Sequence, residues 1–473
     1  MINREYFDEM WFSDGGVRQH YMNFHHEFSQ IPISTIIKKE EIIKNNFLKK
    51  GITFSVYSDN EGAERIFPFD IIPRIIRASE WHTIEKGIKQ RIIALNKFLY
   101  DIYHERNIIS DNIIPKQLIA SCPHYNREVF GIDVPYDIYT HISGIDLIRD
   151  TDGTYYVLED NLRTPSGVSY MLEDREVSKM MFPELMQQYS IKSIAEYPLL
   201  LKNILVSLSP SQNSPRVVIL TPGIYNSAYY EHVFLAKYMG CEIVEGRDLL
   251  VKDHKVYMKT TEGLQRVDVI YRRVDEEYLD PLVFLKDSFL GVPGLLSAYR
   301  KKNVAIVNAI GNGIADDKAI YAYVPDMIRY YLNEDPILKN VPTYSLTDPD
   351  HQSMAFKNMN NMVIKKTNDS GGYGMLIGNT ATDAAIAEMK QNILLNPRSY
   401  IAQPIIKLST VPCFIDGKLS SRHVDLRPYA LYGPEGVKIV PGGLTRVALV
   451  EGSLIVNSSQ GGGSKDTWIV EGY

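Results

Sequence analysis

Three oxygen-bearing side chains stand close together in one part of the sequence. Asp146 precedes the segment YYVLEDNL, in which Glu159 and Asn161 are two residues apart. Alternate residues of a strand point to the same face, so Glu159 and Asn161 are expected to share one. Carboxylate and amide oxygens suit Mg²⁺, which completes its shell with water and substrate phosphates. We therefore predict a magnesium site at Asp146, Glu159 and Asn161; the alternative is an ordinary hairpin followed by a loop.

A lysine followed by a glycine-rich loop forms a second candidate site. The segment MVIKK has the character of a buried strand that ends in Lys365 and Lys366, and TNDSGGYG follows with Gly371, Gly372 and Gly374. Glycines let the backbone approach a bound anion closely. The spacing matches neither the P-loop nor the GxGxxG pattern. We predict a phosphate-binding lysine and loop; the alternative is a solvated hairpin tip.

Two strands and a tight turn are expected to position the first cluster. Residues 136–150 and 154–160 have the pattern of strands, and the turn DTDG (150–153) supplies Asp and Gly for the reversal. Pairing of these strands places residue 146 on the strand opposite residue 159. The hairpin therefore brings the predicted metal ligands together.

The chain divides into four regions by composition. Residues 1–120 form a mainly helical lobe, with apolar residues at helical spacing in 83–103. Residues 121–210 carry the predicted metal-binding hairpin. In residues 211–300 the order strand, helix, strand, strand indicates a small open α/β unit, which we assign to substrate binding. Residues 301–473, with a helix at 314–332 and a strand at 361–366, form the nucleotide-binding lobe.

Composition and charge exclude several classes of partner. The chain has 473 residues, of which 45% are hydrophobic, and its net charge of -6 gives no broad cationic surface for nucleic acid or anionic membrane. Cys122, Cys241 and Cys413 lack the spacing of a disulfide framework or a zinc site. No apolar run approaches the roughly 20 residues of a membrane helix, and the first residues lack a signal-peptide pattern. We predict a cytoplasmic protein that acts on small molecules, and assembly into a homo-oligomer stays open.

Read together, the two clusters resemble the ATP-grasp superfamily, in which a Glu-x-Asn motif binds magnesium and a strand lysine with a glycine-rich lid covers ATP. Glu159 precedes Lys365 by roughly two hundred residues, the reverse of the usual order, which indicates a circular permutation. Longer blocks resemble the bacterial circularly permuted ATP-grasp type 2, or glutathionylspermidine synthase-like, family over nearly the whole chain, with distant similarity to eukaryotic glutathione synthetase. These blocks include HISGIDLIRDTDGTYYVLEDNLRTPSG, TPGIYNSAYYEH, VDVIYRRVDEEYLDPL, NAIGNGIADDKAIYAYV, SSRHVDLRPY and GGLTRVAL.

The resemblance implies a fold and an activity. The fold is α/β (α+β): a circularly permuted ATP-grasp fold with a helical N-terminal lobe and an inserted small α/β substrate unit. The activity is ATP- and Mg²⁺-dependent ligation of a carboxylate to an amine through an acyl phosphate, with release of ADP and phosphate. Two other functions stay open, a non-catalytic ATP-binding scaffold and a small-molecule kinase.

The resemblance also assigns roles to residues. It implies that Lys318 and Lys365 bind the ATP phosphates, that Gln403 lies at the adenine, and that Arg427 and Arg446 meet phosphates and a substrate carboxylate. For Lys318 the alternative is a lysine on a helix surface. Residues implied in holding substrate are Asn226, Ser227, Arg272, Arg273 and the second lid glycines Gly461, Gly462 and Gly463; the alternative for the first four is that they cap a helix and end a strand.

Arg163 departs from the pattern of the polyamine-linking synthetases. Those enzymes carry an acidic residue after Glu-x-Asn, whereas this chain reads EDNLRTP with Arg163 at that position. A guanidinium grips a carboxylate with two parallel hydrogen bonds. We therefore predict an acid-bearing, amino-acid-like or peptide-like substrate and not a free polyamine. The alternative is that Arg163 pairs with Glu173 or Asp174 and only braces the turn.

Overall fold

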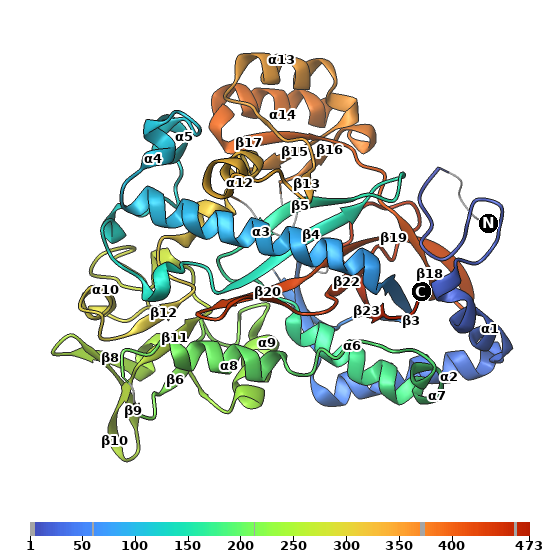
Figure 1. Cartoon of the computed structure of the whole chain (residues 1–473), viewed down its shortest axis with the longest axis horizontal. Coiled ribbons are helices and arrows are strands. Elements are labelled where there is room, and N and C mark those ends of the chain that lie inside the picture. Colours follow the sequence, from blue (N-terminus) through green and yellow to red (C-terminus); the bar gives the residue numbers. More distant parts are fainter. Residues whose placement is uncertain (1–4, 59–60, 212, 369–373, 458–460) are drawn as a thin grey trace.

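A ten-stranded sheet forms the middle of the protein (Figure 1). The computed structural model describes residues 5–58, 61–211, 213–368, 374–457 and 461–473. The main path of the sheet runs in the order β13 (Lys339–Asn340), β5 (Tyr155–Asn161), β4 (Ile142–Arg149), β19 (Lys418–Arg427), β22 (Leu444–Val447), β23 (Gly463–Val470) and β3 (Phe69–Arg77). Off this path, β18 (Thr410–Ile415) pairs with β19, and β20 (Tyr429–Gly433) pairs with β4 and with β21 (Gly436–Ile439). One sheet therefore combines strands from both ends of the chain.

The β4–β5 hairpin has the register that the sequence predicts. Asp146 and Glu159 are direct cross-strand partners. Gly153 in the connecting turn has φ of 81°, a conformation that glycine adopts without strain. A register shift beside Asp146 leaves Leu158 as an extra residue in β5, and such bulges re-aim the side chains next to them. The prediction that the turn delivers Glu159 opposite Asp146 is confirmed.

The N-terminal 120 residues are mainly helical, as predicted, but they also contribute strands. Their helices are α1 (Met22–Gln30), α2 (Ile33–Lys50), α3 (Ala78–Tyr103), α4 (Asn107–Ser110) and α5 (Lys116–Ala120), and α3 contains the predicted helix at 83–103. The β1 strand (Thr53–Ser58) pairs with β2 (Glu61–Ile66), and β3 lies parallel to β23, all eight residues of which are buried. This region is thus tied into the central sheet, and a domain boundary near residue 120 stays a prediction.

The middle of the chain forms a small parallel α/β unit, as its strand and helix pattern predicts. Its sheet has the order β12 (Ala305–Val307), β11 (Val269–Arg272), β6 (Val217–Leu220), β7 (Glu242–Val244). Helix α9 (Tyr229–Met239) ends at Gly240, whose φ of 60° suits glycine. An antiparallel sheet of β8 (Leu249–Lys252), β9 (Lys255–Thr260) and β10 (Gly263–Val267) extends from the unit. The neighbouring helices are α6 (Val168–Met181), α8 (Tyr197–Ser207) and α10 (Leu295–Arg300), and α7 (Pro183–Gln187) follows α6.

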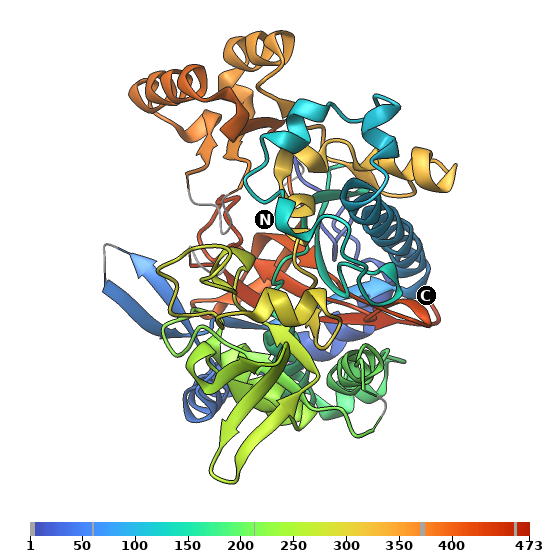
Figure 2. The ribbon, with the colours of Figure 1, turned by 90° about the vertical axis from the view of Figure 1, so that its left-hand side faces the viewer.

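A second four-stranded sheet lies on the other side of the central sheet, as Figure 2 shows. Its order is β14 (Tyr344–Ser345), β17 (Tyr400–Pro404), β15 (Met362–Lys366), β16 (Leu376–Ile377), and it carries α13 (Pro349–Lys357) and α14 (Asp383–Leu395). The helix expected at 314–332 is broken into a 3-10 turn (Asn312–Asp316), α11 (Lys318–Tyr321) and α12 (Val324–Leu332). Pro325 stands in the first turn of α12, where its missing N–H costs no hydrogen bond.

The central sheet shares its core with the elements around it. Phe98 of α3, Val157 of β5 and Ile270 of β11 belong to one buried apolar cluster. The α3 helix crosses in front of the sheet in Figure 1. Among the helices within the described ranges, none is long and apolar enough to cross a membrane.

Candidate functional site

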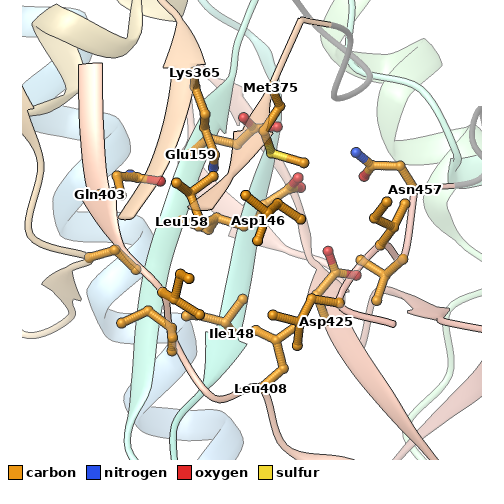
Figure 3. A pocket seen from close by; sticks show the side chains of 18 of the residues that line it. Asp146, Ile148, Leu158, Glu159, Lys365, Met375, Gln403, Leu408, Asp425 and Asn457 are labelled. Atoms are coloured by element: carbon orange, nitrogen blue, oxygen red, sulfur yellow. The ribbon is translucent and has the colours of Figure 1, made fainter. Parts of the chain in front are cut away.

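A cleft of about 990 Å³, including the part open to solvent, lies between the β4–β5 hairpin and the C-terminal four-stranded sheet (Figure 3). Small-molecule sites usually enclose roughly 300–1,000 Å³. The hairpin contributes Asp146, Ile148, Leu158 and Glu159 to the wall, and the opposite sheet contributes Val363, Lys365, Lys366 and Gln403. The cleft therefore unites the two candidate sites that stand far apart in the sequence.

Charge gathers at one part of this cleft, around Glu159. The Lys318 ammonium lies 3.6 Å from Glu159 Oε2, and the Lys318 side chain is only 15% exposed. Lys318 is therefore a lining residue of the cleft, and its binding of the ATP phosphates stays a prediction. Lys365 points toward Glu159 in Figure 3. Burial lowers the pKa of Lys365 to about 8, an effect that the Glu159 carboxylate opposes and the Lys318 ammonium reinforces.

The remainder of the cleft is largely apolar. Its lining includes Ile148, Val341, Ile406 and Leu408. Gln403 is 3% exposed, and its Nε2 donates a hydrogen bond to Thr343 Oγ1 at 2.9 Å. A buried amide beside apolar walls suits a flat, partly polar group such as a purine base. That Gln403 meets adenine stays a prediction.

Asp146 lies beside Glu159 but is held by two arginines. Arg427 approaches both of its oxygens, with Nε at 2.5 Å from Oδ1 and Nη2 at 2.8 Å from Oδ2, and Arg446 Nη2 lies 2.6 Å from Oδ2. Arg446 also pairs with Asp425, where its Nε is 2.9 Å from Oδ1. Burial raises the pKa of Asp146, but the two guanidinium groups outweigh burial and hold that pKa well below its usual range. Two carboxylates and two guanidiniums thus form a neutral buried network at the cleft floor.

This network bears on the predicted magnesium site. Within the described ranges no group of three His, Cys, Asp or Glu side chains is arranged to hold a metal ion. Glu159 is half-buried in the cleft, and Asn161, its neighbour on β5, has a buried amide nitrogen with no hydrogen-bond partner among the described residues. Glu159 and Asn161 fit a Mg²⁺ ion that takes its other ligands from phosphate and water. Asp146 could bind the ion only if an arginine gave up its contact with one of the carboxylate oxygens, so its role as a metal ligand stays a prediction.

Arg163 follows β5 and pairs with carboxylates of two other segments. Its Nε lies 2.9 Å from Asp316 Oδ2, and its Nη1 lies 3.9 Å from Asp275 Oδ1. Glu173 instead pairs with Lys50. The alternative that Arg163 pairs with Glu173 or Asp174 is therefore wrong, because its carboxylate partners are Asp316 and Asp275.

The four residues assigned to substrate binding in the α/β unit differ in burial and in the hydrogen bonds that they already form. The buried Arg272 donates from Nε to the Asn308 carbonyl at 2.8 Å and from Nη2 to Asn312 Oδ1 at 2.8 Å, so it joins β11 to the segment after β12. The buried Arg273 donates to the Pro165 carbonyl at 2.8 Å and pairs with Glu231 at 3.3 Å. Asn226 Oδ1 accepts the Ala228 amide at 2.9 Å just before α9, and Ser227 beside it is half-buried. Their assignment to substrate stays a prediction, since these contacts also serve the fold.

The predicted lid glycines fall partly outside the described residues, as Gly371 and Gly372 do. Gly374 is exposed, and a methyl group there would lie 3.2 Å from Lys366 Cε. Gly461 has φ of 92°. At Gly462 a methyl group would lie 2.1 Å from the Val456 carbonyl oxygen, and Gly463 is buried as the first residue of β23. The segment beside them contributes Val456 and Asn457 to the cleft wall (Figure 3).

Comparison with known proteins places this architecture in a family. The sequence profile described as circularly permuted ATP-grasp type 2 matches residues 73–448. The chain belongs to this family. Glu159 standing before Lys365 in sequence, yet beside it in one cleft, accords with a permuted ATP-grasp chain.

Two relatives and one solved structure accompany the family match. An uncharacterized protein from Synechocystis is 50% identical over 468 residues, which span 99% of this chain and 97% of that protein. A Frankia casuarinae protein provisionally named a glutamate–cysteine ligase is 44% identical over 426 residues, 89% of this chain but 48% of its own length. The structure of a glutathione synthetase-like effector from Globodera pallida, in apo form, superposes with a TM-score of 0.60 at 11% identity, covering 93% of this chain and 98% of that one. The predicted circularly permuted ATP-grasp fold is confirmed.

Asp425 in the cleft, and Asp316 and Thr343, which contact predicted site residues, were not predicted from the sequence. Asp425 lines the cleft and pairs with Arg446, and its spacing of two from Arg427 on β19 was a signal that the pair shares a face. Asp316 orients Arg163, and the acidic pair before Lys318 in IADDK could have indicated it. Thr343, the partner of Gln403, carried no such signal.

Proposed function

We propose that this protein is an ATP- and Mg²⁺-dependent carboxylate–amine ligase that forms an amide through an acyl phosphate and releases ADP and phosphate. The observation that carries the proposal is the convergence of Glu159, Lys318 and Lys365 in one cleft of an ATP-grasp fold. Family membership and the ligase name of the Frankia relative support amide ligation in general. Because the match spans about half of that relative, its named substrates are not carried over.

Phosphoryl transfer needs positioning and charge neutralisation more than a side-chain nucleophile. Lys318 and Lys365 supply two cations at the charged part of the cleft, and the apolar walls near Gln403 accept the base. Mg²⁺, held by Glu159 and Asn161, would neutralise charge on the phosphates when bound. The low pKa of Lys365 indicates a poorly hydrated ammonium, which binds an anion more strongly than a hydrated one does.

Arginines at and near the cleft floor are proposed to hold the acid substrate. Arg427 and Arg446 both pair with Asp146, which is the cross-strand partner of Glu159. Their positive charge is therefore near the site where an acyl phosphate would form. Arg163 lies four residues beyond Glu159 and is proposed to hold a substrate carboxylate. Preorganised cations of this kind stabilise charge that develops in the transition state. The glycine segments near 371 and 461 are proposed as lids that exclude water from the acyl phosphate.

Trapping with hydroxylamine tests this function. Purified protein is incubated with ATP, Mg²⁺, hydroxylamine and a pool of amino acids and dicarboxylic acids, and ADP and hydroxamate are measured. Equal amounts of both are expected, with loss of both in Glu159→Gln and none in the exposed control Glu262→Gln. A stable phosphoester in place of hydroxamate would instead establish a kinase. ATP binding without any ADP formation would establish a scaffold.

A further inference from the structure

The guanidinium of Arg163 is oriented by one carboxylate and keeps its outer fork available. Asp316 accepts from the Arg163 Nε at 2.9 Å and from the backbone amide of Leu162 at 2.5 Å, which fixes both the side chain and the strand end. Within the described ranges, Nη1 and Nη2 of Arg163 form no hydrogen bond, and Nη1 lies 3.9 Å from Asp275 Oδ1. The side chain is 14% exposed. A half-buried fork with two open donors suits a bidentate carboxylate.

The acidic side chains of Asp275 and Glu276 lie close to this fork, and Glu277 follows them in the chain. Glu276 is 3% exposed, and its Oε1 has no hydrogen-bond partner among the described residues, although Oε2 accepts from the Gly311 amide at 2.6 Å. The buried Oε2 of Glu277 likewise lacks a partner within those residues. Asp275, beside them, is 41% exposed. A buried acceptor left unpaired costs free energy, so these oxygens favour a ligand that donates hydrogen bonds.

Arg163 and Glu276 converge over Gly313, together with His124. A methyl group on Gly313 would lie 2.6 Å from Glu276 Oε1, 3.1 Å from His124 Cβ and 3.2 Å from Arg163 Cδ. The Nε2 atom of His124 is also buried without a partner among the described residues. The glycine thus lets an anion-binding group and a cation-binding group approach one point. Neighbouring groups of opposite charge are what a zwitterion needs.

We propose that Arg163, Asp275, Glu276 and Glu277 bind the α-amino-acid head of the acid substrate, with its carboxylate on Arg163 and its free ammonium on the acidic side chains. This inference rests on the proposed ligase function. Arg163 is four residues from Glu159, at most about 13 Å along an extended strand. In this proposal Arg163 holds the α-carboxylate, and the carboxylate that reacts is a second one in the same molecule.

Ligand binding, measured without turnover, tests this assignment. Calorimetric titration in the presence of Mg²⁺ and a non-hydrolysable ATP analogue compares L-aspartate, L-glutamate and L-2-aminoadipate with their counterparts lacking the α-amino group, lacking the α-carboxylate, or N-acetylated. At least one free amino acid is expected to bind tenfold or more tightly than each of its counterparts. Equal binding of the des-amino acids, or no binding by any of the free amino acids, would overturn the proposal.

Variants separate the ammonium from the carboxylate contact. Glu277→Gln and Asp275→Asn are expected to weaken the best amino acid about tenfold while leaving its des-amino counterpart unchanged, and Arg163→Met to weaken both. The exposed Glu262, in the β9–β10 turn, serves as matched control through Glu262→Gln. If the amino acid still binds more tightly than its des-amino counterpart in both acidic variants, the assignment is contradicted. If free amino acids bind more tightly than their counterparts but the hydroxylamine experiment releases no ADP, the ligase function alone is refuted. If ADP is released but the amino acids bind no more tightly than their counterparts, this inference alone is refuted.

Discussion

Replacement of Lys365 by methionine is expected to stabilise the unliganded protein and to weaken ATP binding. Burial lowers the pKa of this lysine from 10.5 to about 8. One pKa unit corresponds to about 1.4 kcal/mol between the two protonation states, so the charged ammonium costs the folded protein about 3 kcal/mol. Methionine fills similar space without that charge. With ATP bound, the wild type is expected to be the more stable of the two proteins. The reason is that a cation about 4 Å from a phosphate contributes about 4 kcal/mol at an effective dielectric constant near 20.

The stability gain depends on pH in a defined direction. The pKa in the folded state is below that in the unfolded state, so between pH 8 and 10.5 the unfolded chain binds more protons. The cost of the charged lysine is therefore complete below about pH 8 and disappears as the pH rises toward 10.5. Lys365→Met should gain about 3 kcal/mol at pH 7 and little at about pH 10.

Urea denaturation at these two pH values measures the effect, and calorimetric titration with a non-hydrolysable ATP analogue measures the affinity. The exposed Lys407 provides the matched control, since Lys407→Met should change neither. A loss of stability at pH 7, or an equal gain at both pH values, would refute the reasoning about burial. Unchanged affinity for the analogue would remove Lys365 from the phosphate site.

Three further outcomes are expected. Glu159→Gln should remain folded and lose ATP-dependent turnover, and in the wild type ATP should raise Tm much more with Mg²⁺ than without it; equal shifts would contradict the metal assignment. Lys318→Ala should lower ATP-dependent activity by about two to three orders of magnitude, because it removes a cation from a poorly hydrated site, and unchanged kinetics would exclude that role. Arg446→Leu should destabilise the protein by about 3–5 kcal/mol in urea, since it leaves Asp425 buried without its partner, whereas a second change, Asp425→Asn, should restore part of the loss.

Local patterns in the sequence predicted the parts of the site that local geometry controls. The DTDG turn closes a short hairpin, so the pairing of Asp146 with Glu159 followed from spacing alone. The strand that carries Lys365 was equally visible in its apolar run. Recognition of the permuted order then brought Lys365 and Glu159 into one cleft.

Contacts between distant segments could not be predicted in the same way. Arg446 and Asp146 are 300 residues apart, and only the folded sheet shows that Arg446 donates a hydrogen bond to the carboxylate of Asp146, the predicted metal ligand. Arg272 and Arg273 appeared available at a strand end, yet both are buried among backbone carbonyls of other segments. Such outcomes depend on tertiary partners, which override local propensity.

The parallel pairing of β3 with β23 determines when the central sheet can be completed during synthesis. The paired residues are about 400 positions apart, and β3 leaves the ribosome early while β23 is among the last strands made. At about 5–20 residues per second, tens of seconds separate the two. During that interval β3 presents an open apolar edge, and unpaired edges of this kind favour aggregation. Completion of the sheet, and with it of the cleft floor formed by β4 and β19, therefore comes late in the synthesis of this chain.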